Sequence, residues 1–392
     1  MKILSVNAGS SSLKFTLFEM PEEKELISGV FERIGIENSF YTIKLNGEKI
    51  KKEAVLANHT DAVKILTQEL LDNNIVEDLS EIKAIGHRMV HGGEKYASSV
   101  LLTDEVIKTV EELSDLAPLH NPANLVGVRA FMEVIPDAVS VGVFDTAFHQ
   151  TMEEDKYLYP VPFEWYEDYG VRKYGFHGTS HKYVSQKMAE ILGKSDAKII
   201  TCHIGNGGSL AAVKDGKCID TSMGFTPNAG IIMGSRSGDI DASLIPYVMK
   251  KSGMSISDID TALNKKSGLL GISGVSSDSR DIEDGIKSGN SRCELAQKMY
   301  VDKIVNYIAM YYVELGGADA IVFTAGVGEN SISTRKQIVE KLDCLGIKLD
   351  EERNNVRGKE ALISSDDSKV QVYVIPTNEE LMIATDTYNL AK

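Results

Sequence analysis

The feature that most constrains the fold is a pattern that occurs twice in the chain. The apolar residues 3–6 lead into a turn of Gly and Ser and then into an alternating segment at 13–17. Residues 199–202 likewise lead into a glycine turn and then into the apolar residues 210–213, an offset of 199 − 3 = 196. Each copy is typical of a strand, a tight turn and a second strand. We interpret the repeat as an internal duplication of a domain, with two unrelated but similar β-hairpins as the alternative.

Length, composition and charge narrow the class of protein. A chain of 392 residues is long enough for two or three domains, and its 43% apolar and 25% charged residues are those of a folded globular protein. The 42 Lys and Arg against 57 Asp and Glu give a net charge of −15, which argues against nucleic acid or an acidic membrane as a partner. The four cysteines are scattered, and neither a signal-peptide core nor a long apolar stretch is found, so we expect a cytoplasmic protein.

Helical and strand patterns alternate through most of the chain, which predicts an α/β fold of two related lobes with a cleft between them. Two of the predicted helices open on Asp residues of the N-cap type, Asp61 and Asp104. We place the lobe boundary near residue 150. The predicted helices are 61–73, 104–117, 294–315 and 333–345, and the strand 318–323 enters a glycine turn at 326–330.

Three glycine-rich turns, at 7–12, 205–209 and 326–330, each follow a predicted strand. Exposed backbone N–H groups in such turns can surround phosphate oxygens, and glycine permits the close approach. The chain has no G-x-x-x-x-G-K-[ST] motif and no complete G-x-G-x-x-G motif, so neither a P-loop nor a Rossmann site is predicted. A single turn would be an ordinary hairpin, but three on one duplicated scaffold favour a phosphate ligand.

Charged side chains stand at turns and strand ends beside these loops. Arg88 and Arg236 lie among glycines, where a guanidinium can pair with a carboxylate or a phosphate. Asp145 and Glu380 follow apolar strands, as the carboxylates that hold Mg²⁺ often do. A solvated arginine on a turn is the alternative for Arg88 and for Arg236, and surface charge is the alternative for Glu380. The combination favours phosphoryl transfer, in which the protein positions the reactants and neutralises their charge.

The histidines leave alternatives open. His177 and His181 have a spacing that suits a metal on a helix, but the Glu of H-E-x-x-H is missing, so zinc hydrolysis has little support. Hydrogen bonding to phosphate oxygens is favoured for this segment, with structural packing as the default for His181. No G-x-S-x-G motif and no recognisable cysteine nucleophile support covalent catalysis.

At these residues the chain resembles the acetate kinase family, within the superfamily of acetate and sugar kinases, Hsp70 and actin. The resemblance spans the whole chain. Its blocks are residues 6–14, 86–94, 118–124, 144–149, 174–181, 220–227, 236–241, 323–330 and 376–380.

The resemblance implies two duplicated domains of the ribonuclease H-like, actin-like ATPase fold. One would be an acyl-substrate lobe of residues 1–148 with a returning C-terminal segment 380–392, and the other a nucleotide-binding and dimerisation lobe of residues 149–379. It also implies a homodimer. The implied reaction is reversible, direct in-line transfer of the γ-phosphoryl group of ATP to acetate, giving acetyl phosphate and ADP, with Mg²⁺ or alternatively Mn²⁺.

The resemblance also assigns roles to individual residues. Arg88 and Arg236 would hold the carboxylate and the transferring phosphoryl group, which His177 and Arg236 would stabilise in the transition state. Asp145 would orient the arginine, Asn7 and Glu379 would organise Mg²⁺, and His120 would be a supporting donor. The acetate methyl pocket would consist of Val90, Leu119, Phe176 and Pro227. The nucleotide would be bound by Lys14, His203, Gly205, Asn206, Gly207, Asp278, Arg280, Gly326, Gly328 and Asn330, and Ser279, in place of a bulky apolar residue, implies looser packing of the base.

Two alternative functions remain at this point. The same chemistry on a longer acid would make the chain a propionate or butyrate kinase. The duplicated fold also serves filament-forming and chaperone ATPases, which hydrolyse ATP without an acid substrate. The pair of arginines argues against the second alternative, because a pure ATPase has no carboxylate substrate to bind.

Overall fold

The computed structural model describes residues 1–118 and 120–392. The chain divides into two compact units, one of Met1–Gln150 with Asn378–Lys392 and the other of Thr151–Thr377. Both units combine a mixed sheet with helices, as the sequence predicts for an α/β fold. Within the described residues, no helix has both the length and the apolar character that crossing a lipid bilayer requires.

In the described part of the first unit, eight strands form one sheet in the order β5-β4-β3-β2-β1-β6-β8-β7. Strands β1 and β2 form the antiparallel hairpin expected from the sequence, and β6 and β8 continue the sheet in parallel with β1. The bounds are β1 Lys2–Ala8, β2 Ser12–Glu19, β3 Lys24–Glu32, β4 Phe40–Leu45, β5 Glu48–Glu53, β6 Ile82–Met89, β7 Val100–Leu101 and β8 Val139–Phe144.

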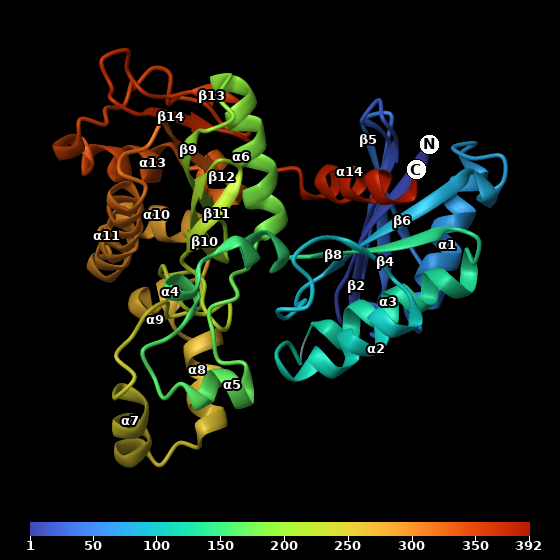
Figure 1. Ribbon diagram of the computed structural model, residues 1–392, viewed down its shortest axis with the longest axis horizontal. Coiled ribbons are helices and arrows are strands. Elements are labelled where there is room, and N and C mark those ends of the chain that lie inside the picture. The colour runs from blue at the N-terminus through green and yellow to red at the C-terminus, as the bar shows by residue number, and fades with distance from the viewer. Residues whose placement is uncertain (119) are drawn as a thin grey trace. The chain divides into compact units, whose positions relative to one another are not determined.

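Alternating side chains of this sheet pack against helices on both of its faces. Leu4 belongs to a core that includes residues of α1 (His59–Asp72) and α3 (Asn121–Val134), whereas its neighbour Ile3 packs with Ala384 of α14 (Glu379–Ala391). Figure 1 shows α14 across the strands of this unit. Gly86 of β6 makes room for α14, because a Cβ atom there would lie 2.2 Å from Thr387 Oγ1. Helix α2 spans Asp104–Glu112.

The described part of the second unit contains a six-stranded sheet in the order β11-β10-β9-β12-β14-β13. Its pairings are antiparallel, antiparallel, parallel, parallel and antiparallel, which is also the sequence of pairings along β3-β2-β1-β6-β8-β7 of the first sheet. This strand-for-strand match confirms the predicted duplication. The bounds are β9 Lys198–Ile204, β10 Gly208–Lys214, β11 Lys217–Thr221, β12 Ala320–Thr324, β13 Ala361–Leu362 and β14 Gln371–Val374.

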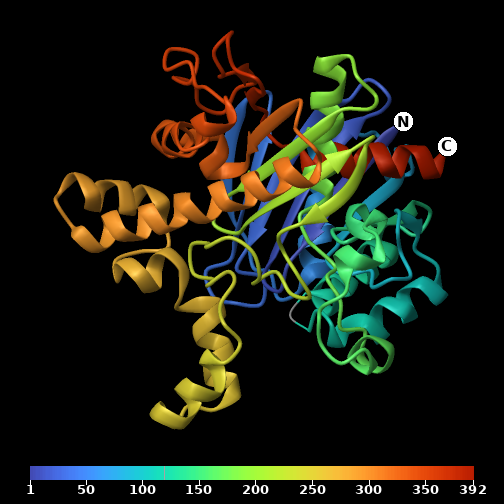
Figure 2. The same ribbon diagram turned by 60° about the vertical axis from the view of Figure 1, so that its left-hand side comes forward.

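The two faces of this second sheet differ in polarity. Ile200, Cys202 and Ile204 of β9 pack with α11 (Ser291–Glu314) in an apolar core, and Figure 2 shows this long helix along the strands. The alternate residues Thr201 and His203 face α6 (Gly178–Leu192) and make polar contacts with it. The remaining helices are α4 Glu154–Tyr157, α5 Glu164–Tyr169, α7 Leu244–Ser252, α8 Ile256–Lys265, α9 Gly268–Ser273, α10 Ser279–Lys287, α12 Ala325–Asn330 and α13 Ile332–Glu340.

Several local predictions were wrong, among them the end of the predicted helix 333–345, because α13 ends at Glu340 and a 3₁₀ turn follows at Asp343–Leu345. The N-caps of α1 and α2 are Asn58 and Thr103, whose side chains accept hydrogen bonds from backbone N–H groups three residues later, so Asp61 and Asp104 lie in the first turns. Helix α2 also ends at Glu112, before a 3₁₀ turn over Leu113–Asp115. The expected glycine turn at 326–330 is the short helix α12, because the chain turns one residue earlier, at Ala325, with φ of 64°.

Candidate functional site

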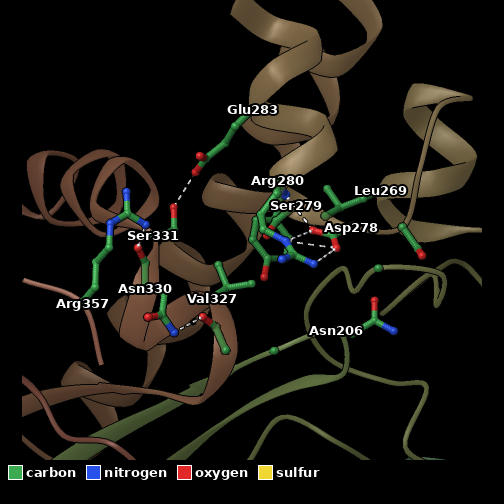
Figure 3. A pocket seen from close by; sticks show the side chains of 15 residues that line it. Asn206, Leu269, Asp278, Ser279, Arg280, Glu283, Val327, Asn330, Ser331 and Arg357 are labelled. Carbon is green, nitrogen blue, oxygen red and sulfur yellow. Dashed lines mark hydrogen bonds and ion pairs between the residues drawn. The ribbon is translucent and has the colours of Figure 1, made fainter. Parts of the chain in front are cut away.

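A cavity of about 550 Å³ lies in the second unit, between the loop after β9, helix α10 and helix α12 (Figure 3). Six residues that the sequence assigned to a nucleotide site line it: Gly205, Asn206, Asp278, Arg280, Gly326 and Asn330. Ser279 also lines the cavity, as do Gly234, Leu269, Ser277, Glu283, Tyr300, Val327, Ser331 and Arg357. Its walls therefore carry apolar, hydroxyl and charged groups of both signs.

The floor of the cavity depends on a close contact between two loops. The backbone N–H of Gly234 donates to the Asn206 carbonyl at 2.9 Å. A Cβ atom at Gly234 would lie 1.9 Å from Asn206 Oδ1 and 2.6 Å from the Ser277 carbonyl oxygen. Only glycine therefore lets the Asn206 side chain take its place at the cavity. Gly326 has open space on the side where a Cβ would stand, so its backbone is accessible to a ligand.

Charged groups of α10 and of its N-cap border the cavity. Asp278 caps α10 and accepts from Arg280 Nε at 3.0 Å, an ion pair that holds the pKa of Asp278 at about 2 (Figure 3). Glu283 accepts hydrogen bonds at 2.6 Å from Ser331 Oγ and from Ser333 Oγ, which ties α10 to α13. The cavity thus has one wall built from α10 and another built from α12 and the start of α13.

At the last residue of the Gly205–Gly207 turn, the Arg236 and His177 side chains both lie close to Gly207. A Cβ atom at Gly207 would lie 3.5 Å from Arg236 Nη1 and 3.8 Å from His177 Nε2. Arg236 donates to the Pro227 carbonyl at 3.1 Å and forms no ion pair with an acidic side chain among the described residues. Burial lowers the pKa of Arg236, which remains a cation at neutral pH. These groups form a cationic and hydrogen-bonding surface suited to an anion.

His177 is held in an unusual backbone conformation. It precedes α6 with φ of 58°, in the left-handed region, where a non-glycine residue costs about 1 kcal/mol or more. Its ring stacks on that of His203 with centroids 4.1 Å apart. His177 therefore lies outside the helix that carries His181, and the described residues contain no cluster of three or more His, Cys, Asp or Glu side chains able to hold a metal.

In the first unit, Arg88 and Asp145 form a bidentate ion pair. Arg88 lies near the end of β6, and Asp145 follows β8, the next strand in the sheet. Arg88 Nε lies 3.0 Å from Asp145 Oδ1 and Arg88 Nη2 lies 2.6 Å from Asp145 Oδ2. Asp145 is 2% exposed, and its charge raises the pKa of Arg88. The guanidinium is consequently fixed in orientation while part of its surface remains accessible.

The start of α14 adds two carboxylates to this part of the first unit. Glu380 forms an ion pair with Lys14 of β2. Lys14 is opposite Asn7 of β1 in the antiparallel pair, so the two side chains share a face of the sheet. Burial raises the pKa of Glu379 to about 7, and the charge of Arg88 opposes this shift. The Glu379 side chain forms no hydrogen bond or ion pair with another described residue.

The structure places the other predicted residues as follows. In the first unit, Val90 is buried just after β6 and His120 directly precedes α3. Lys14 also lies in the first unit, where it forms an ion pair with Glu380, and not at the cavity. Phe176 is buried in the second unit, and Pro227 accepts from Arg236 there. Leu119 lies outside the described residues. His203, Gly207 and Gly328 do not line the cavity: His203 stacks on His177, Gly207 faces Arg236, and Gly328 accepts from the buried Arg335.

Several cavity residues had no signal in the sequence. Arg357 reaches Asn330 from a loop without regular structure, and Leu269 and Tyr300 come from helices whose apolar residues resemble ordinary core positions. Ser331 could have been predicted as the N-cap of α13, because serine is a preferred N-cap residue and Ser331 precedes a helical segment. Its side chain accepts a hydrogen bond from the Thr334 N–H. Tertiary packing alone brings the others to the site.

Comparison with known proteins then decides the family. The model of the acetokinase family matches residues 2–385, which is nearly the whole chain. The chain belongs to the acetokinase family. Within this family, acetate kinases of Bacillus velezensis and Bacillus subtilis are each 56% identical over 393 residues and cover 100% of both chains.

Two solved structures have the same fold as this chain. The crystal structure of Porphyromonas gingivalis acetate kinase has a TM-score of 0.96 and 49% identity, with 100% of each chain covered. That of a propionate kinase from Francisella tularensis has a TM-score of 0.94 and 42% identity, with 99% of each chain covered. The family and the duplicated α/β fold predicted from the sequence are thus confirmed.

Proposed function

We propose that the protein is an acetate kinase that transfers the γ-phosphoryl group of ATP to acetate and gives acetyl phosphate and ADP reversibly. The observation that carries this proposal is the 56% identity to acetate kinases along the full length of both chains. The geometry of the second unit supports it. The Gly205–Gly207 turn has the cavity at Asn206 and the Arg236 and His177 side chains at Gly207, so a nucleotide in the cavity would direct its phosphates toward these two groups.

The reaction requires charge neutralisation rather than a general base. Acetate is already ionised at neutral pH, so its oxygen attacks the γ-phosphorus directly, and the bond from phosphorus to the β,γ-bridging oxygen breaks as ADP leaves. The barrier includes repulsion between the carboxylate and the phosphates. We assign Arg88 and Arg236 to the carboxylate and the phosphoryl group, with Asp145 fixing the orientation of Arg88. His177 would donate to an oxygen of the phosphoryl group during transfer.

A divalent cation is part of the proposal, and the first unit has oxygen donors that fit one. Mg²⁺ uses one or two protein oxygens and completes its shell with water and phosphate, so no cluster of carboxylates is needed. Asn7 supplies an amide oxygen, and Glu379 supplies a carboxylate that forms no hydrogen bond or ion pair with the described residues. Burial raises the pKa of Glu379 to about 7 although the charge of Arg88 opposes the shift. When bound, Mg²⁺ or Mn²⁺ would neutralise phosphate charge, and Asn7 and Glu379 would hold it.

The acid pocket limits the length of the substrate. We assign Val90, Leu119, Phe176 and Pro227 to the pocket for the acetate methyl, of which Val90 and Phe176 are buried. One additional methylene in an apolar pocket changes the binding energy by only about 1–3 kcal/mol, so activity on propionate is a real second candidate. The 42% identity to a propionate kinase from Francisella tularensis favours testing it.

We further propose a homodimer of a cytoplasmic protein, with the first unit as the acyl-substrate lobe and the second as the nucleotide-binding and dimerisation lobe. The second unit exposes large apolar side chains on α5 and α7, such as Trp165 and Tyr247, which a second copy could cover. Light scattering after size exclusion would give the mass. A mass of 42.9 kDa, that of one chain, would contradict the dimer.

One assay tests the proposed reaction. The protein is incubated with ATP, Mg²⁺ and acetate, propionate or butyrate, and acyl phosphate is trapped with hydroxylamine while ADP is measured in parallel. We expect equal amounts of ADP and acyl hydroxamate, and the highest kcat/KM with acetate. A higher kcat/KM with a longer acid would change the substrate, whereas ADP formation that is independent of any acid would favour an ATPase.

A further inference from the structure

A chain of hydrogen bonds lies under α6 and ends at His177. His177 Nδ1 lies 2.9 Å from Ser209 Oγ, and the same hydroxyl lies 2.8 Å from His181 Nε2. His181 Nδ1 in turn lies 2.7 Å from Thr201 Oγ1. Ser209, His181 and Thr201 are completely buried between α6 and strands β9 and β10. The mechanism proposed above uses only His177 and leaves the other three without a role.

This chain of hydrogen bonds determines which ring nitrogen of His177 faces the reactants. Because Nδ1 points at Ser209, the opposite nitrogen, Nε2, points toward Gly207 and the Arg236 side chain. Stacking on His203 fixes the plane of the His177 ring. The left-handed backbone conformation at His177 fixes the position from which the side chain extends. The ring is thus held from the backbone, from one face and from Nδ1.

We propose that Ser209 is a positioning residue that keeps the proton of the neutral His177 ring on Nε2, from which it can donate to the transferred phosphoryl group. This inference rests on the proposed function. The proton order would be Thr201 Oγ1–H to His181 Nδ1, His181 Nε2–H to Ser209 Oγ, and Ser209 Oγ–H to His177 Nδ1. His181 and Ser209 then each donate one proton and accept one, Thr201 donates one and His177 accepts one at Nδ1, so each of the three contacts has one donor and one acceptor.

Charge favours this direction over the reverse. In either direction Thr201 Oγ1 keeps its 2.7 Å contact with His181 Nδ1 and its 3.4 Å contact with the Ala211 carbonyl oxygen. In the reverse order, neutral His177 would carry its proton on Nδ1 and would have none on Nε2 to donate. It could then donate to phosphate only as an imidazolium ion, which the nearby guanidinium of Arg236 disfavours.

The duplicated hairpin of the first unit shows that the fold does not require a hydroxyl at this position. Ser209 pairs with His203, which at the offset of 196 residues corresponds to Asn7. Asn7 pairs with Lys14, because the turn of the first hairpin is one residue longer, so the counterpart of Ser209 in the sheet is Lys14, which forms an ion pair with Glu380. The Ser209 hydroxyl is therefore associated with the chemistry of the second unit, not with the hairpin.

The position of the proton is measured directly by ¹⁵N NMR. Two-bond ¹H–¹⁵N correlations in ¹⁵N-histidine-labelled protein distinguish the two neutral tautomers, and the His177→Gln variant identifies the signals of His177. We expect wild-type His177 to carry its proton on Nε2. We expect Ser209→Ala to lose this preference and to lower kcat by on the order of 10- to 100-fold, less than the loss of a whole donor, with the KM values for ATP and acetate within about threefold.

Further variants separate positioning from a general effect on the fold. Ser209→Thr, which keeps the hydroxyl, should retain the Nε2–H tautomer. Thr201→Val, at the far end of the hydrogen-bond chain, should shift the tautomer in the same direction as Ser209→Ala. It provides a second test if Ser209→Ala does not fold. Ser185→Ala, which removes another buried hydroxyl of α6 that donates to the Lys182 carbonyl, is the control and should change neither tautomer nor kcat.

Two results would overturn the inference: an Nδ1–H tautomer in the wild-type protein, or a Ser209→Ala protein with the wild-type tautomer and kcat. A failure of the proposed function is distinguishable from these. It would appear as no acyl phosphate from the wild-type enzyme, while the NMR experiment would still report the tautomer of His177.

Discussion

The ion pair of Arg88 with Asp145 allows a quantitative test. Asp145→Asn keeps the size of the side chain but removes the negative charge of the carboxylate, which accepts hydrogen bonds from Arg88 Nε and Nη2. Removing one partner of a buried ion pair typically costs about 3–5 kcal/mol, because the other charge remains buried. The Arg88 side chain is 25% exposed, and water offsets part of that cost. We therefore expect the free energy of unfolding to fall by about 2–3 kcal/mol.

A double-mutant cycle measures the pair itself. Urea unfolding of the wild type, Asp145→Asn, Arg88→Met and the double variant gives the coupling free energy, which we expect to be about 2 kcal/mol, so that the double variant is little less stable than either single variant. Both single variants should also lose acetyl phosphate formation, by roughly 100-fold or more, because the guanidinium is absent or no longer oriented. Additive effects on stability, within about 0.5 kcal/mol, would refute the inferred pairing.

Three other predictions follow from single side chains. Gly234→Ala should raise the KM for ATP at least about 10-fold by displacing Asn206, and an unchanged KM in a folded variant would exclude that contact from nucleotide binding. Glu379→Gln in metal-free buffer should raise the free energy of unfolding at pH 8 by up to about 3 kcal/mol but change it little below pH 5. The reason is that burial raises the pKa of Glu379 from 4.5 to about 7, so the wild-type fold loses stability as the pH rises between these values, and parallel urea curves at both pH values test it. Val90→Ala should improve propionate relative to acetate by about 1–3 kcal/mol in kcat/KM, and an unaltered preference would remove Val90 from the pocket.

Much of the fold could be predicted because its signals are local. The strands at 3–6 and 199–202 are apolar runs ahead of glycine turns, and the helix of 294–315 has a regular apolar periodicity, so all three were found close to their observed bounds. The helix starts were less accurate, because Asn58 and Thr103 compete with the nearby Asp residues as caps. Nothing local in the sequence shows that α14 packs on β6, since that contact joins segments about 300 residues apart.

The candidate site could be predicted only in part for the same reason. The glycine turn that holds Asn206 was recognised as a phosphate-binding candidate from its residues, whereas the assignment of Asn206 and Asp278 to the nucleotide came from the resemblance to the acetate kinase family. Arg357 and Tyr300 had no such signal, since they reach the cavity only after distant segments have packed. The role of Ser209 was also hidden: it is one hydroxyl in an apolar strand, and its meaning depends on two histidines from another element.

The position of α14 at the end of the chain has a consequence for folding during synthesis. This helix covers strands that include Gly86 of β6, yet it follows the entire second unit along the chain. A ribosome therefore releases every strand of the first sheet, and then all of Thr151–Thr377, before the segment that covers this surface emerges. During that interval Ile3 and Val141 would be exposed to water, and a nascent chain at this stage would be a natural client for chaperones that bind apolar surface.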